Sequence, residues 1–200
     1  MALDRKEATR FGTETSELPV GFGHHVIYAD EKFDEMVKWY QTLLSGDITT
    51  MPDSAPADLL VREDIDAVVI AKRPGLTQER SPIRTGIFHV AWSYSSLAEL
   101  MTVYQHAKAN GILPLEVLNT GILLQVYYID PEGNGIELQV DAHDTSEATQ
   151  VAQRSGRREG SVAHWVYDPE TILRLMEAGW SDYDILDHEK YHAAAKSGRF

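Results

Sequence analysis

The sequence predicts an α+β protein in which two βαβββ modules in tandem form a curved mixed sheet around a metal site and a helical C-terminal tail follows. The first observation is a repeat, because residues 25–28 (HVIY) return as residues 89–92 (HVAW). The second is that the apolar positions behind each histidine recur at the same offset. The third is that each copy continues with one helical and three extended patterns. Such internal similarity indicates a duplicated module.

Composition limits the classes of function. A chain of 200 residues with 43% hydrophobic content can bury one substantial core. The 18 basic and 31 acidic side chains give a net charge of −13, and no basic run suggests a nucleic-acid partner. Because cysteine is absent, nitrogen and oxygen must supply any metal ligands. We find neither a signal peptide nor about 20 consecutive apolar residues, so we expect a cytoplasmic protein with no membrane partner.

The first module is expected over residues 21–75, after a polar N-terminal arm of residues 1–20. It opens with a strand over residues 22–28, and Asp30 is predicted to cap the helix that follows. Helical spacing is clear in the apolar residues Phe33, Met36, Val37, Tyr40 and Leu44. Gly46 is predicted to end this helix. Three extended segments complete the module, at residues 47–51, 57–62 and 66–72.

The second module is expected over residues 86–141, after a polar linker with two prolines at residues 73–85. A strand over residues 87–93 leads to Ser95 and Ser96, which can cap the next helix. Asn110 and Gly111 are predicted to stop it. Extended segments follow at residues 112–117, 122–129 and 135–140, the last two joined by the tight turn DPEGNG at residues 130–135.

Residues 142–200 are predicted to be a C-terminal extension with a helix. The predicted helix begins with an N-cap residue, a first-turn proline and a first-turn acid, which are Asp168, Pro169 and Glu170. Gly179 is predicted to end it. The apolar side of this helix needs a surface to cover. We expect that surface on the chain's own sheet or on a second subunit, which favours a homodimer or a higher homo-oligomer.

The repeat also indicates a metal site. Equivalent first strands of two paired modules would place His25 and His89 close to a shared axis, whereas His24 aligns with Phe88 and is expected to point outward or to support a ligand. One histidine at a strand start is usually a hydrogen-bonded core residue. Here Glu137 adds a carboxylate in a strand that otherwise reads as buried, where cation binding would offset its desolvation. The strand of residues 67–71 in the first module supplies no further ligand.

Two histidines and one carboxylate are typical of the facial triad, which leaves three octahedral positions open and is most often found with non-haem Fe(II). We therefore expect Fe(II) bound by His25, His89 and Glu137. Zinc and manganese fit this ligand set less well.

Four segments give the chain a resemblance to the vicinal oxygen chelate superfamily, and within it to the one-domain type I extradiol dioxygenases similar to biphenyl-2,3-diol 1,2-dioxygenase III. They are GHHVIYAD (23–30), FHVAWSYSSLAELMTVY (88–104), YYIDPEGNGIELQVD (127–141) and YDPETILRLMEAG (167–179). The resemblance implies that His25, His89 and Glu137 bind iron. It also implies that Tyr127 contacts a bound catechol or polycyclic vicinal diol, which reacts with O2.

The chain departs from this pattern at residues 119–121. Similar proteins carry an Asn-His-Gly element in which the histidine transfers a proton, and this chain has Thr120 at that position. Threonine cannot exchange protons at neutral pH as histidine does. Either His24, Tyr127 or His164 supplies that group, or the metal site carries out different chemistry.

Two other classes remain open: a different metal-dependent enzyme of the superfamily, such as an isomerase, epimerase, lyase or glyoxalase, and a non-enzymatic binding or resistance protein. The complete His/His/Glu set favours catalysis.

Overall fold

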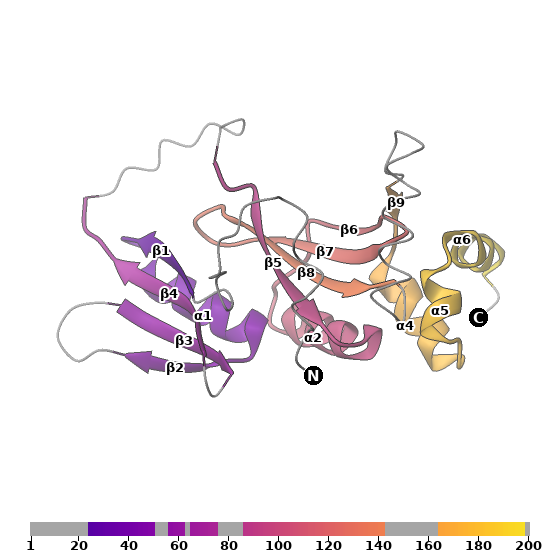
Figure 1. Cartoon of the computed structure of the whole chain (residues 1–200), viewed down its shortest axis with the longest axis horizontal. Coiled ribbons are helices and arrows are strands. Elements are labelled where there is room, and N and C mark those ends of the chain that lie inside the picture. The colour runs from indigo at the N-terminus through magenta and orange to yellow at the C-terminus, as the bar shows by residue number, and fades with distance from the viewer. Residues whose placement is uncertain (1–23, 51–55, 63–64, 76–85, 143–163, 199–200) are drawn as a thin grey trace, which may run out of the picture.

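The computed structural model describes residues 24–50, 56–62, 65–75, 86–142 and 164–198. Figure 1 shows two sheets, each with a helix from its own part of the chain, and a helical tail at the C-terminal end. The predicted α+β class and the repeated strand–helix–strand order are both present. The predicted arm of residues 1–20 and much of the linker lie outside the described residues.

The first sheet is formed from one segment of the chain. Its elements are β1 (His25–Ala29), α1 (Phe33–Leu44), β2 (Asp47–Thr50), β3 (Pro56–Arg62) and β4 (Ile65–Lys72). The strand order is β1-β4-β3-β2, with β1 parallel to β4 and the other pairs antiparallel. This order is that of a βαβββ unit whose first and last strands are neighbours.

The second sheet repeats this arrangement and gains one strand. Its elements are β5 (His89–Tyr94), α2 (Leu97–Ala109), β6 (Glu116–Asn119), β7 (Leu123–Ile129) and β8 (Gly135–Asp141), and the short β9 (Trp165–Val166) comes from the tail. The order is β5-β8-β7-β6-β9, with β5 parallel to β8. The strands therefore form two hydrogen-bonded sheets, one from each repeat.

The helix ends follow the sequence signals in the second repeat but not in the first. Ser96 caps α2 by accepting a hydrogen bond from the Glu99 amide, as predicted. The prediction that Asp30 caps α1 is wrong. The Asp30 carboxylate accepts a hydrogen bond from the Gly75 amide instead, and this bond ties the start of α1 to the end of β4. The helix also ends before Gly46, because Ser45 takes the left-handed conformation with φ 52°.

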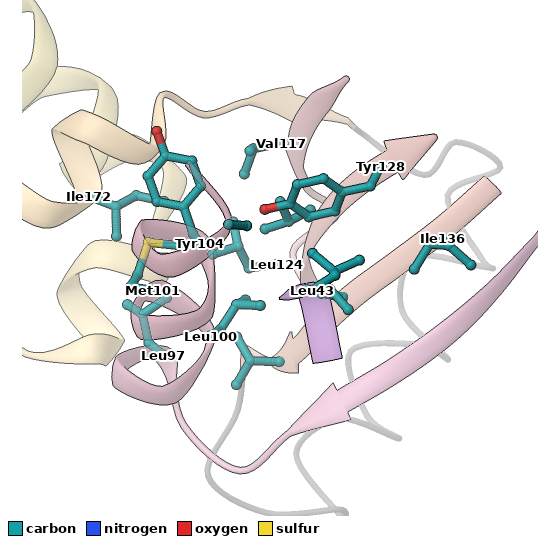
Figure 2. Packing of buried hydrophobic residues seen from close by; sticks show 14 of the residues in the cluster. Leu43, Leu97, Leu100, Met101, Tyr104, Val117, Leu124, Tyr128, Ile136 and Ile172 are labelled. Carbon is teal, nitrogen blue, oxygen red and sulfur yellow. The ribbon is translucent and has the colours of Figure 1, made fainter. Parts of the chain in front are cut away.

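One hydrophobic core joins the two repeats. Figure 2 shows Leu43 of α1 close to residues of the second repeat, among them Leu100 of α2, Leu124 of β7 and Ile136 of β8. All four side chains are at most 1% exposed. Burial of large apolar side chains is the main favourable contribution to folding, so the two repeats stabilise each other.

The turn between β7 and β8 also binds the first repeat. Asp130 is buried and its carboxylate accepts hydrogen bonds from the Asn134 amide and side chain, which shape the turn. The Tyr40 hydroxyl of α1 donates to the same carboxylate at 3.0 Å. Lys32 Nζ donates to the Pro131 carbonyl at 2.6 Å. The DPEGNG segment therefore serves as a structural joint between α1 and the second sheet.

The tail packs on the chain's own second sheet. It contains α4 (Pro169–Glu177), α5 (Asp182–Leu186) and α6 (His188–Ser197), of which only the first was predicted. Asp168 caps α4 as expected. The side chain of Asn119, fully buried on β6, donates to the Tyr167 hydroxyl and the Leu186 carbonyl. Of the two surfaces proposed for the tail, the structure uses the chain's own sheet.

No helix in the described ranges has the length and apolar character needed to cross a membrane.

Candidate metal centre

The two faces of the second sheet differ in chemistry. The face toward the helices carries apolar side chains in alternating positions, such as Val90 and Trp92 of β5 and Leu138 of β8. Alternation along the strands gives the opposite face a polar set, because residues two apart share a face. That set consists of His89 and Ser93 of β5, Glu137 and Gln139 of β8, Gln125 and Tyr127 of β7, and Glu116 of β6.

His89 and Glu137 form the centre of this polar face. They lie on the parallel neighbours β5 and β8, where Glu137 is paired with Ala91, the residue two positions after His89. The Nε2 atom of His89 is 2.9 Å from Oε2 of Glu137. Glu137 is only 1% exposed. The predicted buried acid on the last strand therefore lies next to the predicted histidine of the repeat.

Gly135 allows the two strands to approach at this point. It is paired with His89, and a Cβ atom at Gly135 would lie 2.6 Å from the Phe88 carbonyl oxygen and 3.2 Å from the His89 Cβ. The first of these distances is too short for any side chain, so a substitution would push β5 and β8 apart. The glycine thus fixes the backbone on which His89 is placed.

The donor set at this point fits a divalent cation. Although Oε2 of Glu137 is close to His89, it is buried and accepts no hydrogen bond from the described residues. Metal–nitrogen and metal–oxygen bonds of about 2.1 Å place two ligands at a right angle about 3.0 Å apart. The observed 2.9 Å matches that spacing. A buried carboxylate is costly unless it is paired, and a cation bound between the two groups would stabilise its charge.

Two residues of β7 surround the carboxylate. Gln125 Nε2 donates a hydrogen bond to Oε1 of Glu137 at 2.8 Å. Tyr127 is paired directly with Glu137 across the antiparallel ladder, and its ring centroid is 5.4 Å from that of His89. Tyr127 was among the predicted site residues, and Gln125 was not. The signal for Gln125 was available, because it is a polar residue two positions before Tyr127 on the same strand.

The hydroxyl of Tyr127 stays protonated at neutral pH. Burial, followed by interaction with the Glu137 carboxylate and the charge of Glu116, raises the pKa of Tyr127 well above its usual value of 10.0. Ionisation next to a carboxylate is unfavourable because it would place two negative charges together. Tyr127 can therefore donate a hydrogen bond beside the His89–Glu137 pair but cannot act there as a base near neutral pH.

Two exposed apolar side chains lie near the pair. The Phe88 ring centroid is 4.9 Å from that of His89, and Phe88 is 82% exposed. Ile129 is 48% exposed and shares the face of Tyr127 on β7.

His25, the third predicted ligand, does not form a three-residue metal group with this pair among the described residues. It begins β1, shares a face with Ile27 as predicted, and is paired with the buried Val68. Its ring centroid is 5.8 Å from Trp92, on the core side of β5. Within the described ranges, no group of three or more histidine, aspartate or glutamate residues is arranged to hold a metal ion. The three-ligand set stays a prediction.

The remaining predicted site residues lie outside β5 and β8, the strands that carry the pair. His24 is exposed and precedes β1. Thr120 lies in the turn between β6 and β7, where its hydroxyl accepts a hydrogen bond from the Leu123 amide at 3.1 Å. Leu123, to which Thr120 is bonded, is four strand residues, or about 13 Å, from Tyr127 along β7. His164 is exposed just before β9. The part proposed for His24 and His164 in proton transfer stays a prediction.

Solved structures identify the class of fold. A glyoxylase/bleomycin resistance protein/dioxygenase domain from Frankia sp. EAN1pec matches with a TM-score of 0.53 and 16% identity, over 62% of this chain and 99% of that chain. The fold is thus that of the glyoxalase/bleomycin resistance/dioxygenase domains. Together with the two sequence relatives described next, this fold confirms the predicted resemblance to the vicinal oxygen chelate superfamily.

Comparison of this sequence with those of known proteins finds two relatives from one organism. Biphenyl-2,3-diol 1,2-dioxygenase 2 of Rhodococcus globerulus is 26% identical over 155 residues, covering 78% of this chain and 81% of the relative. Biphenyl-2,3-diol 1,2-dioxygenase 3 of the same organism is 29% identical over 162 residues, covering 80% and 85%. No protein-family model matches the chain.

Proposed function

We propose that this chain is a metal-dependent extradiol-type dioxygenase that uses Fe(II) and O2 to cleave the ring of a catechol or a polycyclic vicinal diol. The observation that carries the proposal is the 2.9 Å spacing between His89 Nε2 and Oε2 of Glu137, an oxygen that accepts no hydrogen bond from the described residues, with Tyr127 beside the pair. The similarity to two biphenyl-2,3-diol 1,2-dioxygenases supports this class of substrate.

In this proposal His89 and Glu137 hold the metal, and His25 is the third ligand on the strength of the sequence repeat. Bound Fe(II) supplies Lewis-acid and redox chemistry toward the diol and O2. The net reaction breaks the ring bond next to the two hydroxyl carbons, and both atoms of O2 enter the ring-opened product.

The protein's own residues orient the substrate. The Tyr127 hydroxyl, which stays protonated, donates a hydrogen bond to one diol oxygen. Phe88 and Ile129 contact the aromatic rings on the apolar side of the site. This division between a hydrogen-bond donor and an apolar wall favours a flat molecule that has its two hydroxyls at one edge.

Oxygen consumption tests the proposal. Protein loaded anaerobically with Fe(II) is mixed with a panel of catechols and bicyclic vicinal diols, and coloured ring-cleavage products are followed by absorbance. We expect uptake of one O2 per diol, and none with Glu137→Ala. Iron-loaded protein that consumes no oxygen with any diol would contradict the proposal. It would favour an isomerase or lyase of the same superfamily, with Thr120 in place of the usual histidine as the reason.

A further inference from the structure

We infer that Gln125 is a positioning residue for Glu137: its amide holds Oε1, so that Oε2 is the single oxygen presented to a metal ion. This inference rests on the proposed function, because it concerns the same centre. It adds a residue that neither the ligand set nor the contact with the diol requires.

The strand pairing places Gln125 to reach Glu137 diagonally. Tyr127 is directly opposite Glu137 on the antiparallel ladder, and Gln125 is opposite Gln139. A diagonal neighbour on the same face is within reach of a long side chain. The Gln125 amide spans this gap and donates to Oε1 at 2.8 Å, whereas Oε2 accepts no hydrogen bond from the described residues.

The two oxygens of Glu137 are therefore not equivalent. Oε1 is engaged by the amide, and Oε2 is the atom 2.9 Å from His89 Nε2. A carboxylate that is free to rotate can bind a metal ion through either oxygen or through both. Binding through both would occupy a coordination position that a substrate needs. With one oxygen held, Glu137 offers one ligand atom. The side chain then loses its rotational freedom when the protein folds and not when the metal binds.

Gln125 is better suited to this task than Tyr127. Tyr127 also interacts with Glu137, but the proposed reaction needs its hydroxyl for the diol. An amide has no charge and donates without losing a proton. Gln125 is half-buried, so the hydrogen bond is partly protected from water. The Glu137 carboxylate would thus keep one donor throughout a catalytic cycle.

The test compares two glutamines of the same face. Gln125→Met removes the donor with little change in size, and Gln139→Met makes the identical change at a residue whose amide donates to Ser93 instead. The affinity for Co(II), measured anaerobically by calorimetry and by the Co(II) absorption spectrum, is the readout. We expect Gln125→Met to weaken Co(II) binding by about 10- to 100-fold and to change the spectrum. Gln139→Met should bind within about twofold of the wild-type protein, because it leaves Glu137 untouched.

Each of the other possible outcomes overturns either the inference or the proposed function. Unchanged Co(II) affinity and spectrum in Gln125→Met overturn the inference and leave the proposed function standing. Equal losses of Co(II) affinity in both variants also overturn it, since the loss would then come from a general change in the sheet and not from the Gln125–Glu137 hydrogen bond. A wild-type protein that binds no Co(II) overturns the proposed function itself. If Gln125→Met does not fold, Gln125→Asn, whose amide is too short to reach Oε1, is measured in its place with the same expectation.

Discussion

His89 Nε2 lies 2.9 Å from Glu137 Oε2 on the polar face of the second sheet, and the two residues belong to parallel strands that the chain connects through α2, β6 and β7. The carboxylate is almost fully buried, and its nearer oxygen accepts no hydrogen bond from the described residues. A buried acid is usually paired or bound to a metal, so this relationship supports the proposed centre.

The hydroxyl of Tyr127 is expected to bind the substrate and not the metal. Tyr127→Phe should lower kcat/KM for a vicinal diol by roughly 10- to 100-fold, because it removes one hydrogen bond to an oxygen that gains charge. Fe(II) affinity should be unchanged. Steady-state oxygen uptake and metal titration measure the two quantities. Tyr183→Phe, at an exposed tyrosine of α5, is the matched control. A Tyr127→Phe enzyme with full kcat/KM would exclude the proposed contact.

The two adjacent histidines at β1 should differ in their effect on metal binding. Because the repeat aligns His25 with His89, His25→Ala should weaken Fe(II) binding by roughly 100-fold or more, and His24→Ala should leave it nearly unchanged. Anaerobic Fe(II) titration of both variants gives the comparison. The reverse order would mean that His24, which shares the exposed side of β1 with Val26 and Tyr28, is the ligand instead.

The joint between the repeats should contribute measurably to stability. Tyr40→Phe removes the hydrogen bond to the buried Asp130 carboxylate and should lower the free energy of unfolding by about 2 kcal/mol. Urea denaturation measures the change. Tyr28→Phe, at a tyrosine that is 52% exposed, should change it by less than about 0.5 kcal/mol. Equal effects of the two variants would show that the Tyr40–Asp130 bond has no special role.

Buried tyrosines should make the fold sensitive to alkali. Burial, with a smaller effect of Glu99, raises the pKa of Tyr94 to about 12 from 10.0. The folded state therefore holds this proton more tightly than the unfolded state. The resulting stability is fully present below about pH 10 and is lost as the pH rises toward about 12.

Urea denaturation between about pH 8 and about pH 11 should show this decline, and Tyr94→Phe should make it shallower. Identical pH profiles for Tyr94→Phe and the wild-type protein would contradict the assignment to Tyr94.

The start of a helix could be predicted from the sequence where a local capping residue alone determines it. Ser96 and Asp168 cap their helices because each has a short side chain that can reach the free amides of the first turn. Asp30 failed as a cap because a tertiary contact with Gly75 takes its carboxylate. The last two helices were missed because α5 is short, α6 has little apolar periodicity, and Asp187 alone separates them.

Part of the candidate metal centre could be predicted from the sequence, because local signals mark two of its residues. Duplication marks His89, and a buried acid in an apolar strand marks Glu137, so both could be found from the sequence. The position of His25 relative to them depends on how the two repeats pack, and a repeat in the sequence does not specify that packing. The contact of Gln125 with Glu137 depends on the register of β7 against β8, which the turn at residues 130–134 sets.

The most direct test of the metal centre is the stoichiometry of bound Fe(II) in anaerobically purified protein, determined by metal analysis for the wild type, Glu137→Ala and Glu116→Ala. Glu116 is an exposed carboxylate of β6 on the same face as Glu137, so it controls for the loss of one negative charge. We predict about one Fe(II) per chain in the wild type and in Glu116→Ala, and almost none in Glu137→Ala. Equal stoichiometry in all three proteins would contradict the assignment of Glu137 and, with it, the proposed centre.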